Sequence, residues 1–435
     1  MTMGRVQTAT CVRSLVVQAA VWMLSTAMGV AWAQADRTPF KFDLGPGRVA
    51  PGYTRVLTSA VYTQERGYGF EPGSAVSGVD RAGDDPLRSD FVTSDRPFLF
   101  SVKVPEGNCR VTVTLGDAAG ESTTTVKAEL RRLMLEKVHT DSGKFKTCTF
   151  VVNIRTPRIA VGGEVRLKDR EKTTEQAAWD DKLTLEFSDK RPCVCAIEVT
   201  KADDVATVYL LGDSTVCDQP SEPWASWGQM LPRFLKPDVA VANHAESGES
   251  IRTSLGAGRF DKVYSLLKKG DYLFLQFGHN DMKDRDPNAL ATYKASLKRI
   301  VAEVRERGAT PVLVTSVERK AGIENDTLAG YPDAVRKVAT EEGAALIDLH
   351  AMSKALYKAL GPDLDKAFQD GAHHNNYGAY ELTQCVVQGI KDNRLDLARH
   401  IVDVFKGFDP AHPDPVGQFQ MPASTGTAGE RPLGN

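Results

Sequence analysis

The pattern of the sequence changes near residue 203, and the change separates two parts of different fold class. From residue 205 onward, apolar runs rich in β-branched residues alternate with segments of helical periodicity. Such runs are typical of strands buried on both faces of a parallel sheet, with helices connecting them. We therefore expect an α/β domain over residues 203–406, with functional groups at the carboxyl ends of its strands. The five runs are VATVYLL, VAVANHA, YLFLQF, PVLVTSV and AALIDL.

Residues 36–202 lack any long helical period. Short segments such as 98–104, 109–117 and 146–154 alternate apolar and polar side chains and are separated by turn residues. This pattern predicts an antiparallel β-sandwich, with KADD at residues 201–204 as the connection to the α/β domain. The segment 407–435 is rich in Pro and Gly, and we expect it to be a poorly ordered tail.

The first 35 residues have the composition of a secretory signal peptide. Arg5 and Arg13 precede a long apolar stretch, and the small residues of AWAQA favour cleavage after Ala33 or Ala35. An N-terminal membrane anchor is the alternative, because the apolar stretch approaches spanning length. We expect export to the periplasm or the exterior, with no membrane span after the signal is removed.

Charge and cysteine content constrain the partners. The 435 residues carry a net charge of −2, so no basic field for nucleic acid is present, and no nucleic-acid partner is expected. Six cysteines remain after Cys11 is removed with the signal. They can form disulfides, for example Cys109 with Cys148, or remain buried free thiols. Composition does not determine the oligomeric state.

The first apolar run of the α/β part leads directly into GDST, residues 212–215. Ser214 is therefore expected just beyond a buried strand, at the start of a helix whose N-terminus favours negative charge. A serine hydroxyl becomes a nucleophile only when a base lies within hydrogen-bonding reach. The alternative is ordinary turn chemistry, in which Asp-Ser pairs are common.

Two further strand-end loops carry groups that can donate hydrogen bonds. Gly248 lies in NHAESGES, where the absence of a side chain allows its backbone N–H to approach a substrate oxygen. Asn280 lies in FGHND and can direct its side-chain amide at the same oxygen, which is how an oxyanion hole is assembled. A plain loop glycine and an Asx-turn are the respective alternatives.

The stretch DGAHHNNYG, residues 370–378, places two histidines side by side. Asp370 lies three residues before His373, close enough to orient its imidazole and leave the other ring nitrogen for the serine proton. His374 is expected on the opposite side of the backbone. A metal site that uses Asp370, His373, His374, His279 and Asp281 is the competing interpretation, but no HExxH-like spacing supports it.

The segments GDST, NHAESGES, FGHND and DGAHHNNYG together resemble the block pattern of the SGNH (GDSL) hydrolases over residues 205–392. They are most similar to the rhamnogalacturonan acetylesterase branch, apart from Ala372, where that branch usually has Thr. The resemblance implies a three-layer α/β/α sandwich with a five-stranded parallel sheet and no metal or other cofactor. It also implies Ser214, Asp370 and His373 as the catalytic triad, and the backbone of Ser214 and Gly248 with the side chain of Asn280 as the oxyanion hole.

The resemblance further implies an esterase that acts on acetylated plant cell-wall polysaccharide, with rhamnogalacturonan ahead of acetylxylan. Arg252 is a candidate for binding a uronate carboxylate, and Trp224 and His279 are candidates for sugar contacts; solvated or core roles are the alternatives. The β-sandwich loosely resembles galactose-binding-like modules, through FDLGPG and GYGF near its start. A non-catalytic carbohydrate-binding protein is therefore the alternative of another class.

Overall fold

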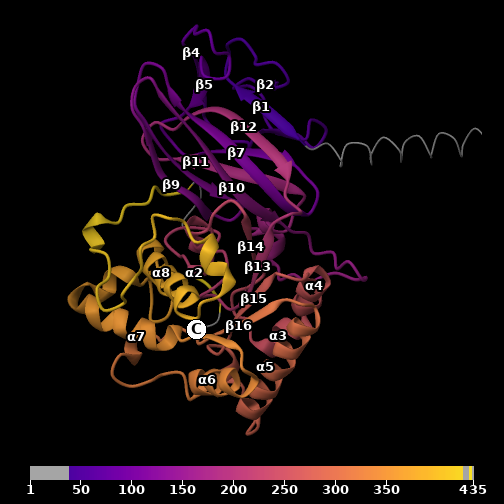
Figure 1. The fold of residues 1–435 in the computed structure, drawn as a ribbon, viewed down its shortest axis with the longest axis vertical. Coiled ribbons are helices and arrows are strands. Elements are labelled where there is room, and N and C mark those ends of the chain that lie inside the picture. Colours follow the sequence, from indigo (N-terminus) through magenta and orange to yellow (C-terminus); the bar gives the residue numbers. More distant parts are fainter. Residues whose placement is uncertain (1–38, 425–430, 434–435) are drawn as a thin grey trace, which may run out of the picture.

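The computed structural model describes residues 39–424 and 431–433, which form two domains stacked along the long axis of the molecule (Figure 1). The predicted signal peptide and its cleavage site lie outside the described residues. Within those residues, no helix combines the length and the apolar character needed to cross a membrane.

The N-terminal domain is a β-sandwich of a seven-stranded and a five-stranded sheet. The seven-stranded sheet contains β10 (Lys144–Ile154), β7 (Gly107–Asp117), β12 (Cys193–Lys201), β1 (Phe40–Leu44), β2 (Thr54–Val56), β5 (Asp90–Thr93) and β4 (Ser77–Asp80). The five-stranded sheet contains β3 (Tyr68–Phe70), β6 (Phe98–Lys103), β11 (Lys182–Ser188), β8 (Ser122–Ala128) and β9 (Arg132–Thr140). Strand pairs are antiparallel except β1–β2, and alternate residues of both sheets fill the core between them. The prediction of an all-β domain is confirmed.

The C-terminal domain is built on a parallel sheet of five strands. Their order is β14 (Val239–Asn243), β13 (Ala206–Gly212), β15 (Tyr272–Gln276), β16 (Thr310–Val314) and β17 (Ala345–Ile347). These are the five apolar runs predicted from the sequence. Successive side chains of a strand point to opposite faces, so Val208 and Leu210 join one core cluster and Tyr209 and Leu211 join another.

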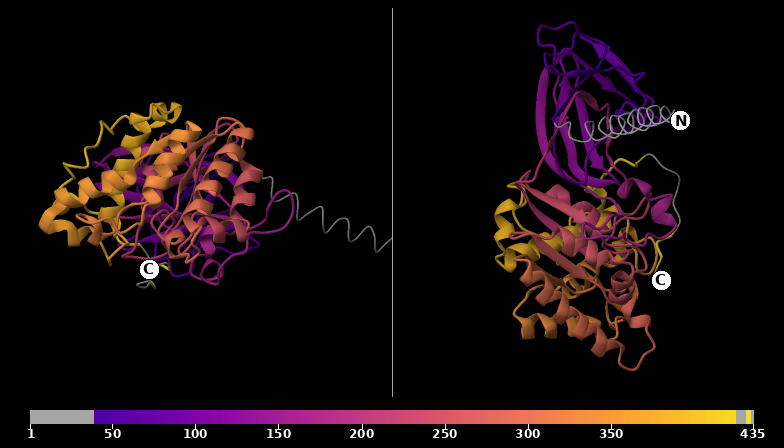
Figure 2. Two further views of the ribbon diagram at one scale, coloured as in Figure 1. Left: turned by 90° about the horizontal axis from the view of Figure 1, so that it is seen from below. Right: turned by 90° about the vertical axis from the view of Figure 1, so that its right-hand side faces the viewer.

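Helices cover both faces of this sheet (Figure 2). One face packs against α2 (Trp227–Met230), α7 (Leu349–Leu360) and α8 (Asn376–Asp392). The other packs against α3 (Ile251–Gly256), α4 (Arg259–Leu266), α5 (Ala289–Glu306) and α6 (Tyr331–Glu342). The predicted apolar stripe of α5 is buried from Tyr293 to Val304. The domain is therefore the three-layer α/β/α sandwich that the family resemblance implied.

The two domains meet over a buried surface that contains charged groups. Arg132 of β9 donates from Nη1 to the carbonyl of Val241 in β14 at 3.3 Å, and its Nε lies 3.3 Å from Asp218 Oδ2. Arg259 of α4 forms two hydrogen bonds with Glu171 of the N-terminal domain. All four of the charged side chains in these contacts are at most 4% exposed. The domains are thus joined by a buried polar interface as well as by the chain.

The connection between the domains is part of this packing. Ala202 is fully buried and donates from its backbone N–H to the carbonyl of Asn108 at 2.8 Å. It joins Val151, Val205 and Ala240 in a small apolar cluster that includes β10 and β14. The KADD segment is therefore held against both domains.

Two expectations about order and covalent links differ from the structure. The prediction of a poorly ordered tail is wrong for residues 407–424, because this segment packs against α8. Phe419 contacts Tyr377 and Tyr380, and Tyr377 Oη donates to the Asp414 carbonyl at 2.7 Å. Regular structure in this segment is limited to the short 3-10 helix η8 (Val416–Gln418), but Phe408 and Phe419 are still half-buried. A Cys109–Cys148 disulfide is also wrong: the β7–β10 ladder places Cys109 opposite Val152, and all six described cysteines are free.

Candidate active site

Ser214 lies two residues beyond the end of β13, at the carboxyl end of the parallel sheet. The chain then forms a turn, because Asp213 Oδ1 accepts hydrogen bonds from the backbone N–H and the hydroxyl of Thr215 at 2.9 and 2.8 Å. The predicted helix immediately after GDST is therefore wrong, since the first helix beyond it, α2, begins only at Trp227. Asp213 satisfies the turn with its own side chain, which competes with helix formation.

His373 connects Ser214 to Asp370. Its Nε2 lies 2.8 Å from Ser214 Oγ, and its Nδ1 lies 2.9 Å from Asp370 Oδ2. The other carboxylate oxygen of Asp370 accepts the backbone N–H groups of Ala372 and His373 at 2.7 Å each. Burial raises the pKa of Asp370, but these hydrogen bonds outweigh it and hold the pKa below its usual value. The ionised Asp370 keeps the proton of His373 on Nδ1 and leaves Nε2 as the acceptor for the serine hydroxyl.

His374 points away from this chain of hydrogen bonds. Its Nε2 lies 2.8 Å from Tyr357 Oη, and its ring packs against Phe368 with centroids 4.2 Å apart. Burial, with smaller effects from the neighbouring His373 and His279, lowers the pKa of His374 to about 3, so the imidazole stays neutral. The two adjacent histidines therefore occupy different environments: one bonds Ser214, and the other belongs to the core.

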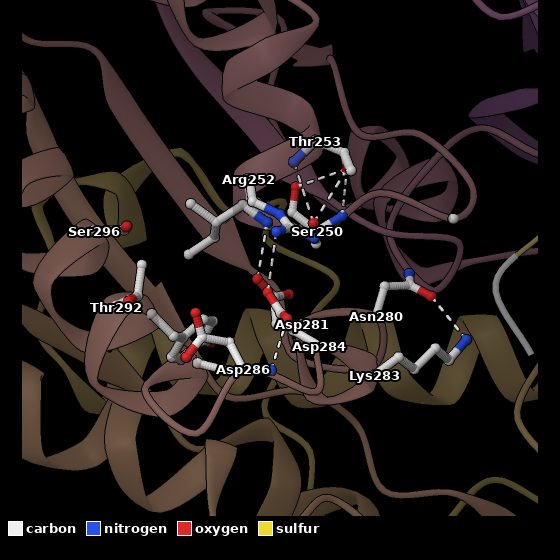
Figure 3. A pocket seen from close by; sticks show the side chains of 14 residues that line it. Ser250, Arg252, Thr253, Asn280, Asp281, Lys283, Asp284, Asp286, Thr292 and Ser296 are labelled. Atoms are coloured by element: carbon white, nitrogen blue, oxygen red, sulfur yellow. Dashed lines mark hydrogen bonds and ion pairs between the residues drawn. The ribbon is translucent and has the colours of Figure 1, made fainter.

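Gly248 and Asn280 lie on neighbouring loops, after β14 and β15. Gly248 has a φ of +77°, a conformation that favours glycine. Asn280 Nδ2 donates to the Glu249 carbonyl at 2.9 Å, which joins the two loops, and Asn280 Oδ1 accepts from Lys283 Nζ at 3.0 Å. Both residues line a cavity of about 340 Å³, to which Arg252, Lys283 and Asp284 also contribute (Figure 3).

The three candidate substrate contacts have different placements. Arg252 is exposed, lines the same cavity and forms an ion pair of 3.3 Å with Asp284. Trp224 is half-buried, and its ring meets His373 edge to face with centroids 5.9 Å apart. His279 is only 1% exposed and its Nε2 lies 2.8 Å from the Val317 carbonyl, so a substrate contact for His279 is wrong.

The side chains that the metal interpretation would use have other partners. His279 pairs with the Val317 carbonyl, His374 with Tyr357, and His373 with Ser214 and Asp370. Asp281 accepts the backbone N–H of Ile251 at 2.9 Å and thereby holds the start of α3. Among the described residues, the groups with converging acidic and histidine ligands are Glu318, Asp326 and His350, and Glu171, Glu175 and Glu246. Neither group includes a residue from DGAHHNNYG or FGHND.

Residues that sequence reasoning missed also contact the site. Gln219 donates from Nε2 to the Ser214 carbonyl at 2.8 Å, and Arg131 of the β-sandwich donates to the carbonyls of Gln219 and Trp224. Trp179 of the β-sandwich is 7% exposed and lies between the domains, with its ring centroid 6.0 Å from that of His244. No local pattern indicates the contacts of Arg131 and Trp179, because their partners are far apart in the chain.

The end of the described chain returns to the same region. Arg431 Nε lies 2.7 Å from Asp370 Oδ2, the oxygen that also pairs with His373. Leu433 lies against Gly248. A side chain at position 248 would meet it, because the Cβ position there is 3.2 Å from Leu433 Cβ. Residues 431–433 thus contact the loops of both Asp370 and Gly248.

Comparisons with known proteins agree with this architecture. A family model described as the GDSL-like lipase/acylhydrolase family matches residues 210–380, and a galactose-binding domain-like model of β-agarase and YxiM-type esterases matches residues 40–148. Over 217 residues the chain is 37% identical to the rhamnogalacturonan acetylesterase RhgT of Bacillus subtilis, covering 45% of this chain and 94% of that relative. Over 378 residues it is 29% identical to the uncharacterized esterase YxiM of Bacillus subtilis, covering 82% and 92%.

The crystal structure of YxiM from Bacillus subtilis is similar to this chain with a TM-score of 0.44 and 27% identity, covering 82% of this chain and 99% of that one. RhgT exceeds 30% identity and is matched over nearly its full length. The chain therefore belongs to the GDSL-like lipase/acylhydrolase family and is a carboxylic ester hydrolase.

Proposed function

We propose that the protein is a serine esterase that removes acetyl groups from a plant cell-wall polysaccharide, with acetylated rhamnogalacturonan as its substrate. The observation that supports this most directly is the hydrogen-bonded series Ser214–His373–Asp370, with distances of 2.8 and 2.9 Å. Nucleophile, base and orienting acid are then within reach of one another at the carboxyl end of the parallel sheet.

In the proposed mechanism, Ser214 Oγ attacks the acetyl carbonyl carbon while His373 Nε2 takes the hydroxyl proton. The tetrahedral intermediate collapses, the C–O bond to the sugar breaks, and His373 returns the proton to the leaving sugar oxygen. A water molecule, deprotonated by His373, then attacks the acetyl carbon of the acetyl-enzyme. The bond to Ser214 Oγ breaks, His373 returns the proton to Oγ, and acetate is released. Asp370, ionised and bonded to Nδ1, stabilises the imidazolium that forms in each half of the reaction.

The oxyanion is assigned to three donors: the backbone N–H groups of Ser214 and Gly248 and the side-chain amide of Asn280. The Asn280 amide nitrogen carries two hydrogens, and one of them is held by the Glu249 carbonyl. This bond orients the amide and leaves the second hydrogen for substrate. Donors fixed before the reaction stabilise the developing charge without reorganisation.

We assign the binding surface for the sugar chain to the residues on either side of the three proposed oxyanion donors. Arg252 lines the cavity beside Gly248 and Asn280 and can pair bidentately with a uronate carboxylate in place of Asp284. Trp224, beside His373, presents an aromatic edge to the leaving sugar. The similarity to RhgT, a rhamnogalacturonan acetylesterase by name, favours a pectic backbone with uronate units.

The test measures acetate release from acetylated rhamnogalacturonan and from acetylxylan, with wild type and Ser214→Ala. We expect faster release from rhamnogalacturonan, no effect of EDTA, and loss of activity in Ser214→Ala on both polymers and on p-nitrophenyl acetate. Faster release from acetylxylan would reassign the substrate. Polymer binding without any hydrolysis by wild type would favour the carbohydrate-binding alternative.

We also propose that the protein is exported, because the N-terminal sequence up to Ala35 has the pattern of a cleaved signal. A polymeric substrate outside the cell requires this location. N-terminal sequencing of the mature protein from the periplasm and the medium should begin at Gln34 or Asp36. A full-length N-terminus in the membrane fraction would contradict the proposal.

A further inference from the structure

The turn between β8 and β9 of the β-sandwich reaches into the other domain, against the loop that follows Ser214. Glu129 and Arg131 in this turn have φ values of +57° and +60°, which non-glycine residues rarely adopt. Arg131 is only 6% exposed, although it lies on a turn and carries a charge. Strained backbone and a buried charge persist only where the surroundings hold them, and such positions are concentrated at functional sites.

The Arg131 guanidinium binds two separate segments of the α/β domain. Its Nη1 donates to the carbonyls of Trp224 and Gln219 at 2.9 and 3.2 Å. Its Nη2 donates to Asn376 Oδ1 at 3.1 Å and pairs with Glu222 Oε1 at 2.6 Å. One rigid, planar group therefore fixes the loop 219–224 against the start of α8.

Each of these segments contacts a member of the proposed triad. Gln219 donates to the carbonyl of Ser214 at 2.8 Å, and the ring of Trp224 packs against that of His373. Asn376 is the first residue of α8, three positions after His373. Arg131 touches neither Ser214 nor His373, but it holds the neighbours on which the placement of both depends.

The rest of the turn strengthens this attachment. Gln229 Nε2 donates to the carbonyl of Leu130 at 2.7 Å and to that of Gln219 at 2.9 Å. Lys127, at the end of β8, is 1% exposed and lies 3.9 Å from Glu222 Oε1. The β-sandwich thus supplies a cationic support to the loop that carries Gln219, Glu222 and Trp224.

We propose that Arg131 is a positioning residue of the esterase, supplied by the β-sandwich, which holds the Ser214 loop and the His373 segment in register. This inference rests on the proposed triad. It gives the β-sandwich a part in the chemistry itself, independent of whether that domain binds sugar.

The test compares Arg131→Lys and Arg131→Ala with wild type on p-nitrophenyl acetate, a substrate too small to need a polymer-binding domain. Competent sites are first counted by reaction to completion with a serine-directed reagent, so that kcat is expressed per competent site. We expect kcat per site to fall about 10–100-fold in Arg131→Lys with little change in KM, because small displacements of catalytic groups have effects of that size. Added guanidinium should partly restore Arg131→Ala.

Arg191→Lys is the matched control, because Arg191 is a β-sandwich arginine whose partners, Asp117 and Glu121, belong to the same domain. Its kcat per site should equal that of wild type. A purely structural role for Arg131 would lower the number of competent sites and leave kcat per site within twofold of wild type; that result overturns the inference. If Arg131→Ala does not fold, Arg131→Lys decides.

The outcome also separates this inference from the proposed function. If Ser214→Ala hydrolysed the substrate at the wild-type rate, the proposed triad would be refuted. An inactive Ser214→Ala beside a fully active Arg131→Lys would leave the triad intact and refute only the role of Arg131.

Discussion

Arg431 donates a hydrogen bond of 2.7 Å from Nε to Asp370 Oδ2. The same oxygen pairs with His373 Nδ1 at 2.9 Å, so two donors share one carboxylate oxygen. The positive charge of the Arg431 guanidinium partly neutralises the Asp370 carboxylate. The carboxylate then stabilises a protonated His373 less strongly. The contact therefore opposes the general-base role proposed for His373.

We predict that Arg431→Gln increases kcat/KM for p-nitrophenyl acetate about 2–5-fold. The gain is small because the Arg431 side chain is 55% exposed, and exposed ion pairs contribute at most about 1 kcal/mol. Added salt should increase wild-type activity in the same direction and have less effect on the variant. Arg48→Gln, which alters an exposed arginine of the β-sandwich, serves as the control; a decrease in Arg431→Gln would contradict the prediction.

Asn280→Ala should fold normally and lose about 10²–10³-fold in kcat, the usual effect of removing one oxyanion donor. KM should change little, because the donor acts on charge that develops in the transition state. Circular dichroism and thermal unfolding check the fold, and Asn288→Ala, at the start of α5, controls for the loss of an amide. Near-wild-type turnover in Asn280→Ala would exclude its oxyanion role.

The two adjacent histidines should respond differently to substitution. His373→Ala should lose activity by about 10⁴–10⁶-fold with a normal melting temperature, because only the proposed base is removed. His374→Ala should retain turnover per competent site but lose about 1–3 kcal/mol of stability, since Tyr357 Oη loses its buried partner. Loss of turnover confined to His374→Ala would mean that the wrong imidazole has been assigned.

Stability should decrease in acid partly through His374. Its pKa is lowered to about 3 in the folded state, whereas an unfolded histidine titrates near its ordinary value of about 6.5. Between these values the unfolded chain binds a proton that the folded chain does not, so the free energy of unfolding falls as pH falls, by up to about 1.4 kcal/mol per pH unit. Denaturant titrations between pH 7 and pH 4 should show that the free energy of unfolding depends less steeply on pH in His374→Gln than in wild type. Identical pH dependences of the two proteins would contradict this.

Arg252→Ala should reduce kcat/KM for acetylated rhamnogalacturonan about tenfold and leave p-nitrophenyl acetate hydrolysis unchanged. The reason is that the proposed contact is with a uronate carboxylate of the polymer and not with the acetyl group. The matched variant Asp284→Asn removes the competing partner of Arg252 and should not weaken binding of the polymer. Equal effects of Arg252→Ala on both substrates would remove Arg252 from the substrate site.

Much of the architecture could be predicted because its signals are local. The five parallel strands coincide with apolar runs, and DGAHHNNYG places Asp370 and His373 three residues apart on one loop. The helix predicted after Ser214 failed because a single carboxylate, that of Asp213, closes a turn there. The role of Arg131 was not predictable: 245 residues separate it from Asn376, and only the folded interface brings the two together.

The polar interface between the domains also constrains how this chain can change over evolutionary time. RhgT matches 45% of this chain and 94% of itself, so more than half of this chain has no counterpart in that relative. The surface of the α/β domain that meets the β-sandwich carries His244 and Arg259, which are at most 1% exposed. The N-terminal domain contributes Glu171, Trp179 and Arg132 to the same interface. A deletion of the β-sandwich would leave these side chains adapted to a neighbour that is gone. Truncation alone would therefore not give a stable single-domain protein; the exposed surface would have to be rebuilt first, one compensated substitution at a time.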